Sequence, residues 1–167
     1  MNSKYYLRIV LCSKIVKIIT EIMYESRQMQ VITRTIFIRS KGEGDMIDIT
    51  PEISKILTES KLKDGIITIF VSGSTAAVTT IEYEPGLRQD FPHMLSRIVP
   101  KNIEYQHENM WHDGNGHSHV RASLIGPSLT IPFKDSTLML GTWQQIVFLE
   151  MDINKRERNV ILQIMGE

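Results

Sequence analysis

The sequence has little of what marks a secreted or nucleic-acid-binding protein. Cys12 is its single cysteine, which excludes an internal disulfide and is typical of a reducing compartment. Basic and acidic residues number 19 each, and aromatic residues make up 7% of the chain, so a nucleic acid would find neither a basic track nor stacking side chains. We therefore expect a cytoplasmic protein that does not bind nucleic acid.

Long apolar runs are also missing. The most apolar stretch, residues 5–23, is interrupted by a charged residue every few positions, whereas a membrane span needs roughly 18 consecutive apolar residues. No small-residue cleavage site follows this stretch, which argues against a signal peptide. We expect no association with a membrane.

The length of 167 residues suits one domain with its own hydrophobic core. Regular patterning begins at Gln30, so residues 1–29 are interpreted as an N-terminal extension and residues 30–167 as a single domain. Alternatively, the natural start of the protein is Met23 or Met29. The intact mass of the native protein distinguishes these hypotheses.

Strand patterns dominate the domain. Side chains alternate over residues 31–38, and a glycine-containing turn leads from there to a short strand at residues 46–49. Residues 66–71 are a continuous β-branched apolar run, typical of a strand buried on both faces, and residues 76–83 resume extended structure. Further strands are predicted near residues 103–107, 117–125, 128–133, 138–151 and 158–165.

Two helices are predicted among these strands. The first has Thr50 as its N-cap, Pro51 at its first position, and ends before Gly65. The second covers about residues 90–99 and stops at Pro100. The prediction is an α+β fold of antiparallel or mixed β-sheets with two main helices on one side.

Histidines cluster in one segment. Four of the five lie between positions 107 and 119, and imidazole is the commonest side-chain metal ligand. On a strand, His117 and His119 would project from the same face, and His107 from the preceding strand would supply a third nitrogen. Asp113 would add an oxygen ligand or orient an imidazole. The pattern predicts a divalent metal site, and the alternative is a solvated histidine pair.

Three other segments combine functional side chains. Glu82 shares a strand face with Glu84 and is either a general base, a cation ligand or half of a solvated pair. Residues 72–76 are small and hydroxyl-rich, which favours a tight turn over a phosphate-binding nest. Residues 126–128 and 141–145 place glycine next to polar side chains, which indicates close approach to a ligand or a second subunit, although Trp143 also suits a core.

Taken together, these segments resemble the YjbQ family of secondary thiamine-phosphate synthase-like proteins. The likeness covers about residues 30–167. The segments that carry it, in chain order, are residues 48–50 (Asp-Ile-Thr), 65–71 (Gly-Ile-Ile-Thr-Ile-Phe-Val), 74–77 (Ser-Thr-Ala-Ala), 82–86 (Glu-Tyr-Glu-Pro-Gly), 105–107 (Tyr-Gln-His), 113–119 (Asp-Gly-Asn-Gly-His-Ser-His), 124–128 (Leu-Ile-Gly-Pro-Ser) and 140–145 (Leu-Gly-Thr-Trp-Gln-Gln).

The resemblance implies an α+β homotrimer with a polar pocket close to the subunit interface and weak thiamine-phosphate synthase activity. That reaction joins a hydroxymethylpyrimidine diphosphate to a thiazole phosphate and releases pyrophosphate. The alternative is a non-catalytic protein that binds or senses a metal or a metabolite. Many relatives have the sequence His-Thr-Ser/Thr-Ala where this chain has residues 72–77 (Ser-Gly-Ser-Thr-Ala-Ala), and Glu82 is the candidate to take up part of the missing histidine's role.

The resemblance also implies a set of site residues. The catalytic candidates are His107, Asp113, His117, His119 and Glu82. The candidate ligands of zinc or magnesium are His107, His117 and His119. The candidates for binding a phosphorylated small molecule are Asn115, Arg121, Ser128, Thr142, Trp143 and Gln144. Here Arg121, Ser128 and Thr142 would neutralise the departing pyrophosphate, and Trp143 would stack on a flat heterocycle.

Overall fold

The computed structural model describes residue 17 and residues 28–167. The predicted N-terminal extension therefore lies outside the described residues, except for positions 17, 28 and 29. No helix in the described part of the chain is long and apolar enough to cross a membrane.

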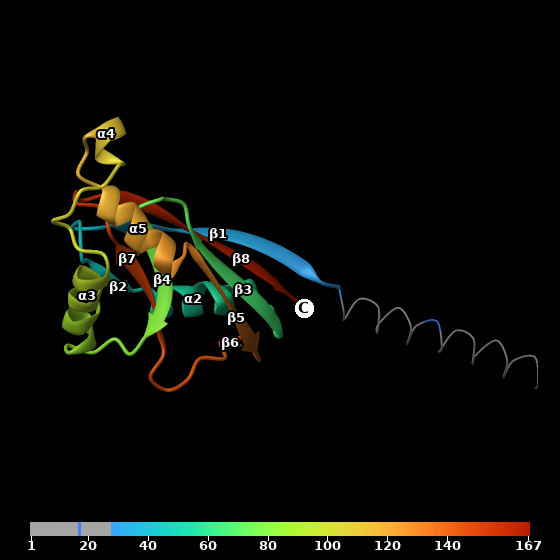
Figure 1. Cartoon of the computed structure of the whole chain (residues 1–167). Helices are drawn as coiled ribbons and strands as arrows, with labels where there is room; N and C mark the ends of the chain where they lie inside the picture. The colour runs from blue at the N-terminus through green and yellow to red at the C-terminus, as the bar shows by residue number, and fades with distance from the viewer. Residues whose placement is uncertain (1–16, 18–27) are drawn as a thin grey trace, which may run out of the picture.

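Two antiparallel sheets form the body of the protein (Figure 1). The larger sheet has the order β1-β8-β3-β5-β6, with bounds Gln30–Arg39, Glu157–Gly166, Gly65–Val71, Ser128–Lys134 and Thr137–Leu138. The smaller sheet has the order β2-β7-β4, with bounds Met46–Asp48, Gln145–Glu150 and Ala76–Ile81. The described helices are α2 (Thr50–Ser60), α3 (Leu87–Ile98), α4 (Glu108–Trp111) and α5 (Gly116–Ile125).

Strand β7 lies between two hydrophobic clusters. Ile146 and Phe148 pack into the larger cluster with α2 and the inner face of the larger sheet, whereas Val147 and Leu149 pack with α3 and α5. Alternate side chains of a strand point to opposite faces, so the apolar residues 146–149 leave neither face of β7 for solvent. The smaller sheet is thus a middle layer between the larger sheet and the two helices.

The predicted α+β fold with antiparallel sheets is confirmed, and so are both long helices. Their predicted position on one side is wrong, because α2 packs in the cluster on one face of β7 and α3 in the cluster on the other face. One detail of α2 is wrong: Thr50 is its first residue and does not cap it, because its Oγ1 accepts a hydrogen bond from the Ile146 amide at 2.7 Å. The predicted strand at residues 103–107 is also wrong, since these residues form bends and turns leading into α4. Most important for function, residues 117–125 belong to a helix, α5.

Candidate functional site

The helical conformation of α5 separates the two imidazoles that the sequence placed together. Residues two apart on an α-helix point about 200° away from each other, whereas on a strand they share a face. His117 accordingly points into the protein with 2% of its surface exposed, and His119 points to the other side of α5. The prediction that His117 and His119 share a face is wrong.

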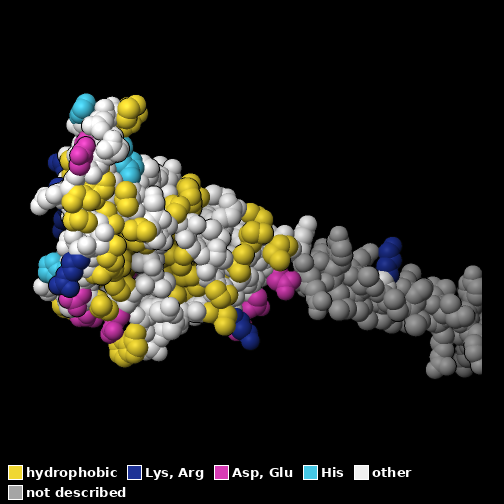
Figure 2. Space-filling view, in the orientation of Figure 1, with side chains coloured by type: hydrophobic (Ala, Val, Ile, Leu, Met, Phe, Trp, Pro, Cys, Tyr) yellow, Lys and Arg dark blue, Asp and Glu magenta, His cyan; other side chains and the backbone are white. Residues whose placement is uncertain are grey.

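His119 instead meets the other two predicted ligands. Possible ligand atoms of His107, Asp113 and His119 all lie within 4.8 Å of one another. The imidazole rings of His107 and His119 are 4.5 Å apart between centroids, and Nε2 of His107 lies 3.2 Å from Oδ1 of Asp113. In the space-filling view, histidine side chains emerge at the end of the molecule that carries α4 and α5 (Figure 2).

The three side chains of this cluster could hold a metal ion. Nε2 of His107 is buried, and its hydrogen-bond geometry toward Asp113 is too poor to give it a partner among the described residues. Ligands about 2.0–2.1 Å from a tetrahedral zinc ion lie roughly 3.3 Å from each other, close to the separation of His107 and Asp113. Two imidazoles and one carboxylate are also the ligand set of many catalytic zinc sites.

Backbone contacts hold the loop that carries Asp113. The Glu108 carboxylate accepts hydrogen bonds from the amides of Gly114 and Gly116 at 2.8 and 2.9 Å, and these lower its pKa. Asp113 accepts a hydrogen bond from the Asn115 amide at 3.0 Å, which lowers the pKa of Asp113. At Gly116 a Cβ atom would lie 2.5 Å from the Tyr105 side chain, so only glycine fits there. The Asp113 carboxylate is therefore ionised and oriented before any ligand binds.

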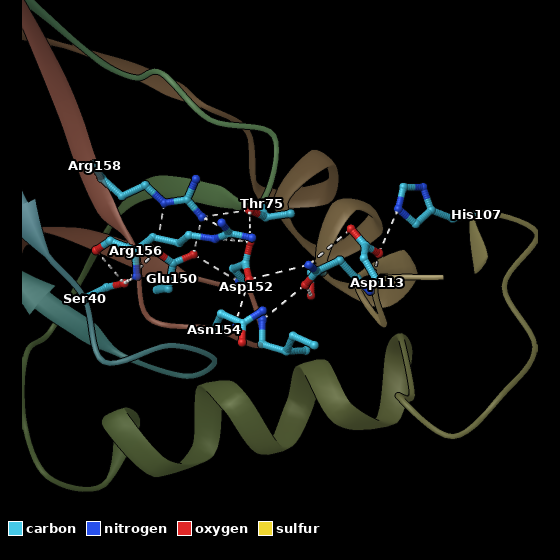
Figure 3. A network of polar contacts seen from close by, with 12 residues as sticks. Ser40, Thr75, His107, Asp113, Glu150, Asp152, Asn154, Arg156 and Arg158 are labelled. Atoms are coloured by element: carbon cyan, nitrogen blue, oxygen red, sulfur yellow. Dashed lines mark hydrogen bonds and ion pairs between the residues drawn. The ribbon is translucent and has the colours of Figure 1, made fainter. Parts of the chain in front are cut away.

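A cavity of about 400 Å³ opens beside the cluster. It is lined by Ser74, Thr75, Asp113, Asn115, His119, Asp152, Arg156, Glu157 and Arg158. Behind it lies a network of buried charges (Figure 3). Arg158 binds the fully buried Glu150 through Nε at 2.9 Å and Nη2 at 2.6 Å, and the same Nη2 donates to Thr75 at 2.7 Å.

Asp152 and Asn115 link this network to the histidine cluster. Asp152 accepts hydrogen bonds from Nε of Arg156 at 2.9 Å and from Thr75 at 3.1 Å. The side-chain nitrogen Nδ2 of Asn115 donates to Oδ1 of Asp152 and to Oδ2 of Asp113, each at 3.5 Å. Oδ1 of Asn115 accepts a hydrogen bond from the backbone amide of Ile153 at 3.1 Å. The predicted residue Asn115 therefore does lie at the site, as a buried connector.

His117 and Arg121 belong to a different part of the molecule. Both contact Oε1 of Glu43, at 3.1 Å and 2.7 Å, and Lys101 contacts Oε2 at 2.7 Å. Although burial raises the pKa of Glu43, its hydrogen bond with Lys101 and its other partners lower that pKa overall. Glu43 and Arg121 line a larger cavity of about 530 Å³ beside α3, which shares no lining residue with the histidine cavity.

The buried position of His117 predicts a specific pH dependence. Burial lowers the pKa of His117, even though the nearby Glu43 carboxylate raises it. Histidine in the unfolded chain takes up a proton at about pH 6.5, whereas the native His117 ring stays neutral to a lower pH. The free energy of unfolding should therefore fall as the pH drops below about 6.5. Protonation of the carboxylates with lowered pKa reduces the free energy of unfolding further only below about pH 4.5. Urea unfolding of the wild type between pH 7.5 and 5 measures this slope.

The matched variant is His117→Gln, whose amide still donates to Glu43 but does not titrate. It is expected to flatten the curve of unfolding free energy between pH 7 and 5. An unchanged slope in this variant would assign the dependence to other groups.

The remaining predicted residues lie away from the cavity within one chain. Glu82 is exposed just after β4, at the opposite end from Thr75, about 23 Å away at roughly 3.3 Å per residue of strand. Thr142, Trp143 and Gln144 precede β7, whose other end carries Glu150. Ser128 begins β5 opposite Phe70 and is not among the residues that line the cavity.

The sequence interpretation missed the charged residues of the cavity floor. Glu150 and Asp152 lie two residues apart, as do Arg156 and Arg158, and a turn separates the two pairs. Acidic and basic pairs at this spacing on either side of a turn indicate side chains that meet across it. That pattern was available in the sequence as a signal of a buried ion network.

The described fold and site can be compared with known proteins. A family model described as UPF0047 protein YjbQ-like matches residues 34–167. The chain belongs to the YjbQ family. A UPF0047 protein of Methanocaldococcus jannaschii is 39% identical over 131 residues, which is 78% of this chain and 91% of the relative. A UPF0047 protein of Methanothermobacter thermautotrophicus is 36% identical over 83% of this chain and 95% of the relative.

Solved structures of YjbQ-like proteins share the fold. A YbjQ-like protein of unknown function from Sulfolobus solfataricus matches with a TM-score of 0.79 and 32% identity, covering 84% of this chain and all of that one. A hypothetical protein from Aeropyrum pernix matches with a TM-score of 0.75 and 31% identity, covering 81% of this chain and 99% of that one. Membership of the YjbQ family and its fold are therefore established for this chain.

Proposed function

We propose that the histidine cavity binds a divalent metal ion and acts on a small phosphorylated molecule. The observation that carries this proposal is the convergence of His107, Asp113 and His119, together with the buried Nε2 of His107 that has no partner among the described residues. Imidazole nitrogens favour zinc over magnesium, which prefers oxygen ligands. When bound, such an ion polarises a phosphoryl oxygen as a Lewis acid.

Thiamine-phosphate synthesis is the reaction that we propose, on the strength of the family resemblance. The exocyclic methylene carbon of the hydroxymethylpyrimidine loses its C–O bond to diphosphate and gains a bond to the thiazole nitrogen, and pyrophosphate leaves. In this chain, His107, Asp113 and His119 would hold the metal beside the leaving group, and the Asn115–Asp152 network would keep Asp113 in place. His117 would help to hold α5 in position through its contact with Glu43, on the side of the helix that faces away from the cluster.

We further propose, from the family resemblance, that the protein is a homotrimer. Assembly is supported by the remaining candidate residues, which lie too far from the cavity within one chain. Trp143 is 69% exposed and Glu82 lies on the surface. Large apolar side chains are also exposed elsewhere, such as Phe37 at 80%, and apolar patches run along the face seen in Figure 2. A second copy would bring Thr142, Trp143 and Gln144 to the site. Light scattering of the purified protein measures the assembly mass.

The second candidate is a non-catalytic metal- or metabolite-binding protein. It is favoured by one observation: within a single chain the cavity holds ligand-binding groups, whereas Glu82 and Trp143 lie outside it. Turnover separates the two candidates.

The decisive assay uses protein stripped of metal and then refilled with Zn²⁺ or Mg²⁺. Given both precursors, the refilled protein is expected to form thiamine phosphate, detected by chromatography, and the stripped protein is not. His112→Asn, stripped and refilled in the same way, controls for the loss of a histidine outside the cluster and is expected to behave like the wild type. His112 is exposed, lies outside the cluster, and has a left-handed backbone that asparagine tolerates. If the refilled protein binds metal but forms no product, the synthase proposal fails and the binding protein remains.

A further inference from the structure

The charges that line the histidine cavity do not favour an anion by themselves. Three carboxylates, those of Asp113, Asp152 and Glu157, face two guanidinium groups, those of Arg156 and Arg158. Glu150, behind the cavity, adds another carboxylate and is paired with Arg158. A phosphorylated molecule that entered this cavity without a metal would therefore meet an excess of negative charge. A divalent ion at the histidine cluster would remove that excess.

The two arginines differ in how far their hydrogen-bonding groups are already used. The Arg158 side chain is 10% exposed, is bound in a bidentate manner to Glu150, and also donates to Thr75. It is a structural residue. The Arg156 side chain is 46% exposed and is anchored only through Nε, which donates to Asp152. Among the described residues, none accepts a hydrogen bond from Nη1 or Nη2 of Arg156.

Asp152 places these unused donors at the cavity. The Asp152 side chain is 3% exposed and is itself held by Thr75 and the Asn154 amide, so its oxygen gives Arg156 a rigid support. Arg156 and Asp113 both line the cavity, which puts a guanidinium group and a metal ligand around the same space (Figure 3). Guanidinium groups bind phosphate oxygens in a bidentate manner, which suits the two free nitrogens.

We propose that Arg156 is the phosphate-binding residue of this cavity and that it binds a phosphoryl group more tightly when a metal is bound at His107, Asp113 and His119. The inference rests on the proposed function for the metal and adds the phosphate-binding residue and its coupling to the metal. The family resemblance implied this role for Arg121, which lies instead in the cavity beside α3, where its Nε donates a hydrogen bond to the Val99 carbonyl at 3.0 Å. Metal and phosphate each strengthen the binding of the other by the same factor.

The test uses phenyl phosphate, a soluble monoester that chelates zinc weakly. Isothermal titration calorimetry measures its affinity for Zn²⁺-loaded and stripped protein, with zinc binding measured separately. Phenyl phosphate is expected to bind the loaded wild type at least about 5-fold more tightly than the stripped protein, within the usual range of coupling between sites. Arg156→Ala is expected to weaken binding to the loaded protein by at least about 10-fold, since a hydrogen bond to a charged group is lost, while zinc affinity is retained.

Arg97→Ala is the matched control, because Arg97 is an exposed arginine of α3 that lines neither cavity. It is expected to bind phenyl phosphate like the wild type. Equal affinity of wild type and Arg156→Ala, or equal affinity of loaded and stripped protein, overturns the inference. If the wild type binds zinc but no phenyl phosphate, the inference fails while the metal site stands. If it binds no zinc, the proposed function fails, and with it the coupling.

Discussion

Replacing His119 with alanine is expected to weaken Zn²⁺ binding by at least about 100-fold, because loss of an outer-shell partner of a metal ligand already costs about 10- to 100-fold. The residue supplies one of three clustered ligand atoms and no other described side chain is placed to substitute for it. Competition against a fluorescent zinc chelator measures the dissociation constant. The wild type is expected to bind one zinc ion per chain.

The contrast with His117 makes this experiment specific. His117→Gln is expected to leave zinc affinity within about threefold of the wild type, because the native side chain points to Glu43 on the other side of α5. A loss of zinc binding in His117→Gln as well as in His119→Ala would return the ligand assignment to the one drawn from the sequence. Circular dichroism confirms that each variant is folded before the titration.

Replacing Arg158 with methionine is expected to lower the free energy of unfolding by about 3–5 kcal/mol, the usual cost of leaving one partner of a buried ion pair alone. Glu150 has no solvent exposure, and Arg158 provides two of its closest contacts. Ser40 and the Asp152 amide would still donate to Glu150, but neither carries a charge to balance it. Urea denaturation at pH 7.5 measures the change.

The double variant Glu150→Leu with Arg158→Met distinguishes the cost of an unpaired buried charge from the cost of altered side-chain packing. Its stability is expected to recover most of the loss, because removing both charges leaves no uncompensated ion in the core. Arg39→Met is the matched control for a single arginine, and it is expected to have little effect because solvent screens its exposed pair with Glu157. An Arg158→Met variant as stable as the wild type would show that water compensates Glu150 in the native protein.

Much of the fold was predictable because its signals are local. The β-branched run at residues 66–71 became β3, whose Ile67 and Ile69 are fully buried. The prediction that both faces of this strand are buried is wrong, because Ile66 and Phe70 on the other face are exposed. The segment at Thr50 and Pro51 did start a helix. The tight turn expected within residues 72–76 separates β3 from β4. Each of these depends on neighbours within a few positions.

The helix α5 was not predictable by the same means. Its buried face consists of small and polar residues, among them His117, Ser118 and Arg121, so hydrophobic periodicity does not reveal it. These side chains are buried because partners distant in sequence satisfy them: Glu43 for His117 and Arg121, and Asn115 for Ser118. Reading the segment as a strand paired the wrong histidines, yet His107, Asp113 and His119 still came together through the loop before α5.

The central position of β7 makes the site sensitive to the length of that strand. Its pairing with both β2 and β4 leaves no free edge along which it could slide. Met151 packs in the apolar cluster under α3, while the carboxylates on either side of it both contact Arg158. Deleting a single residue between Ile146 and Glu150 would shift the register by one position. The Met151 side chain would then face Arg158, and the Asp152 carboxylate would face the apolar cluster. Natural variation in this protein should therefore lengthen or shorten the loop before β7, and not the strand.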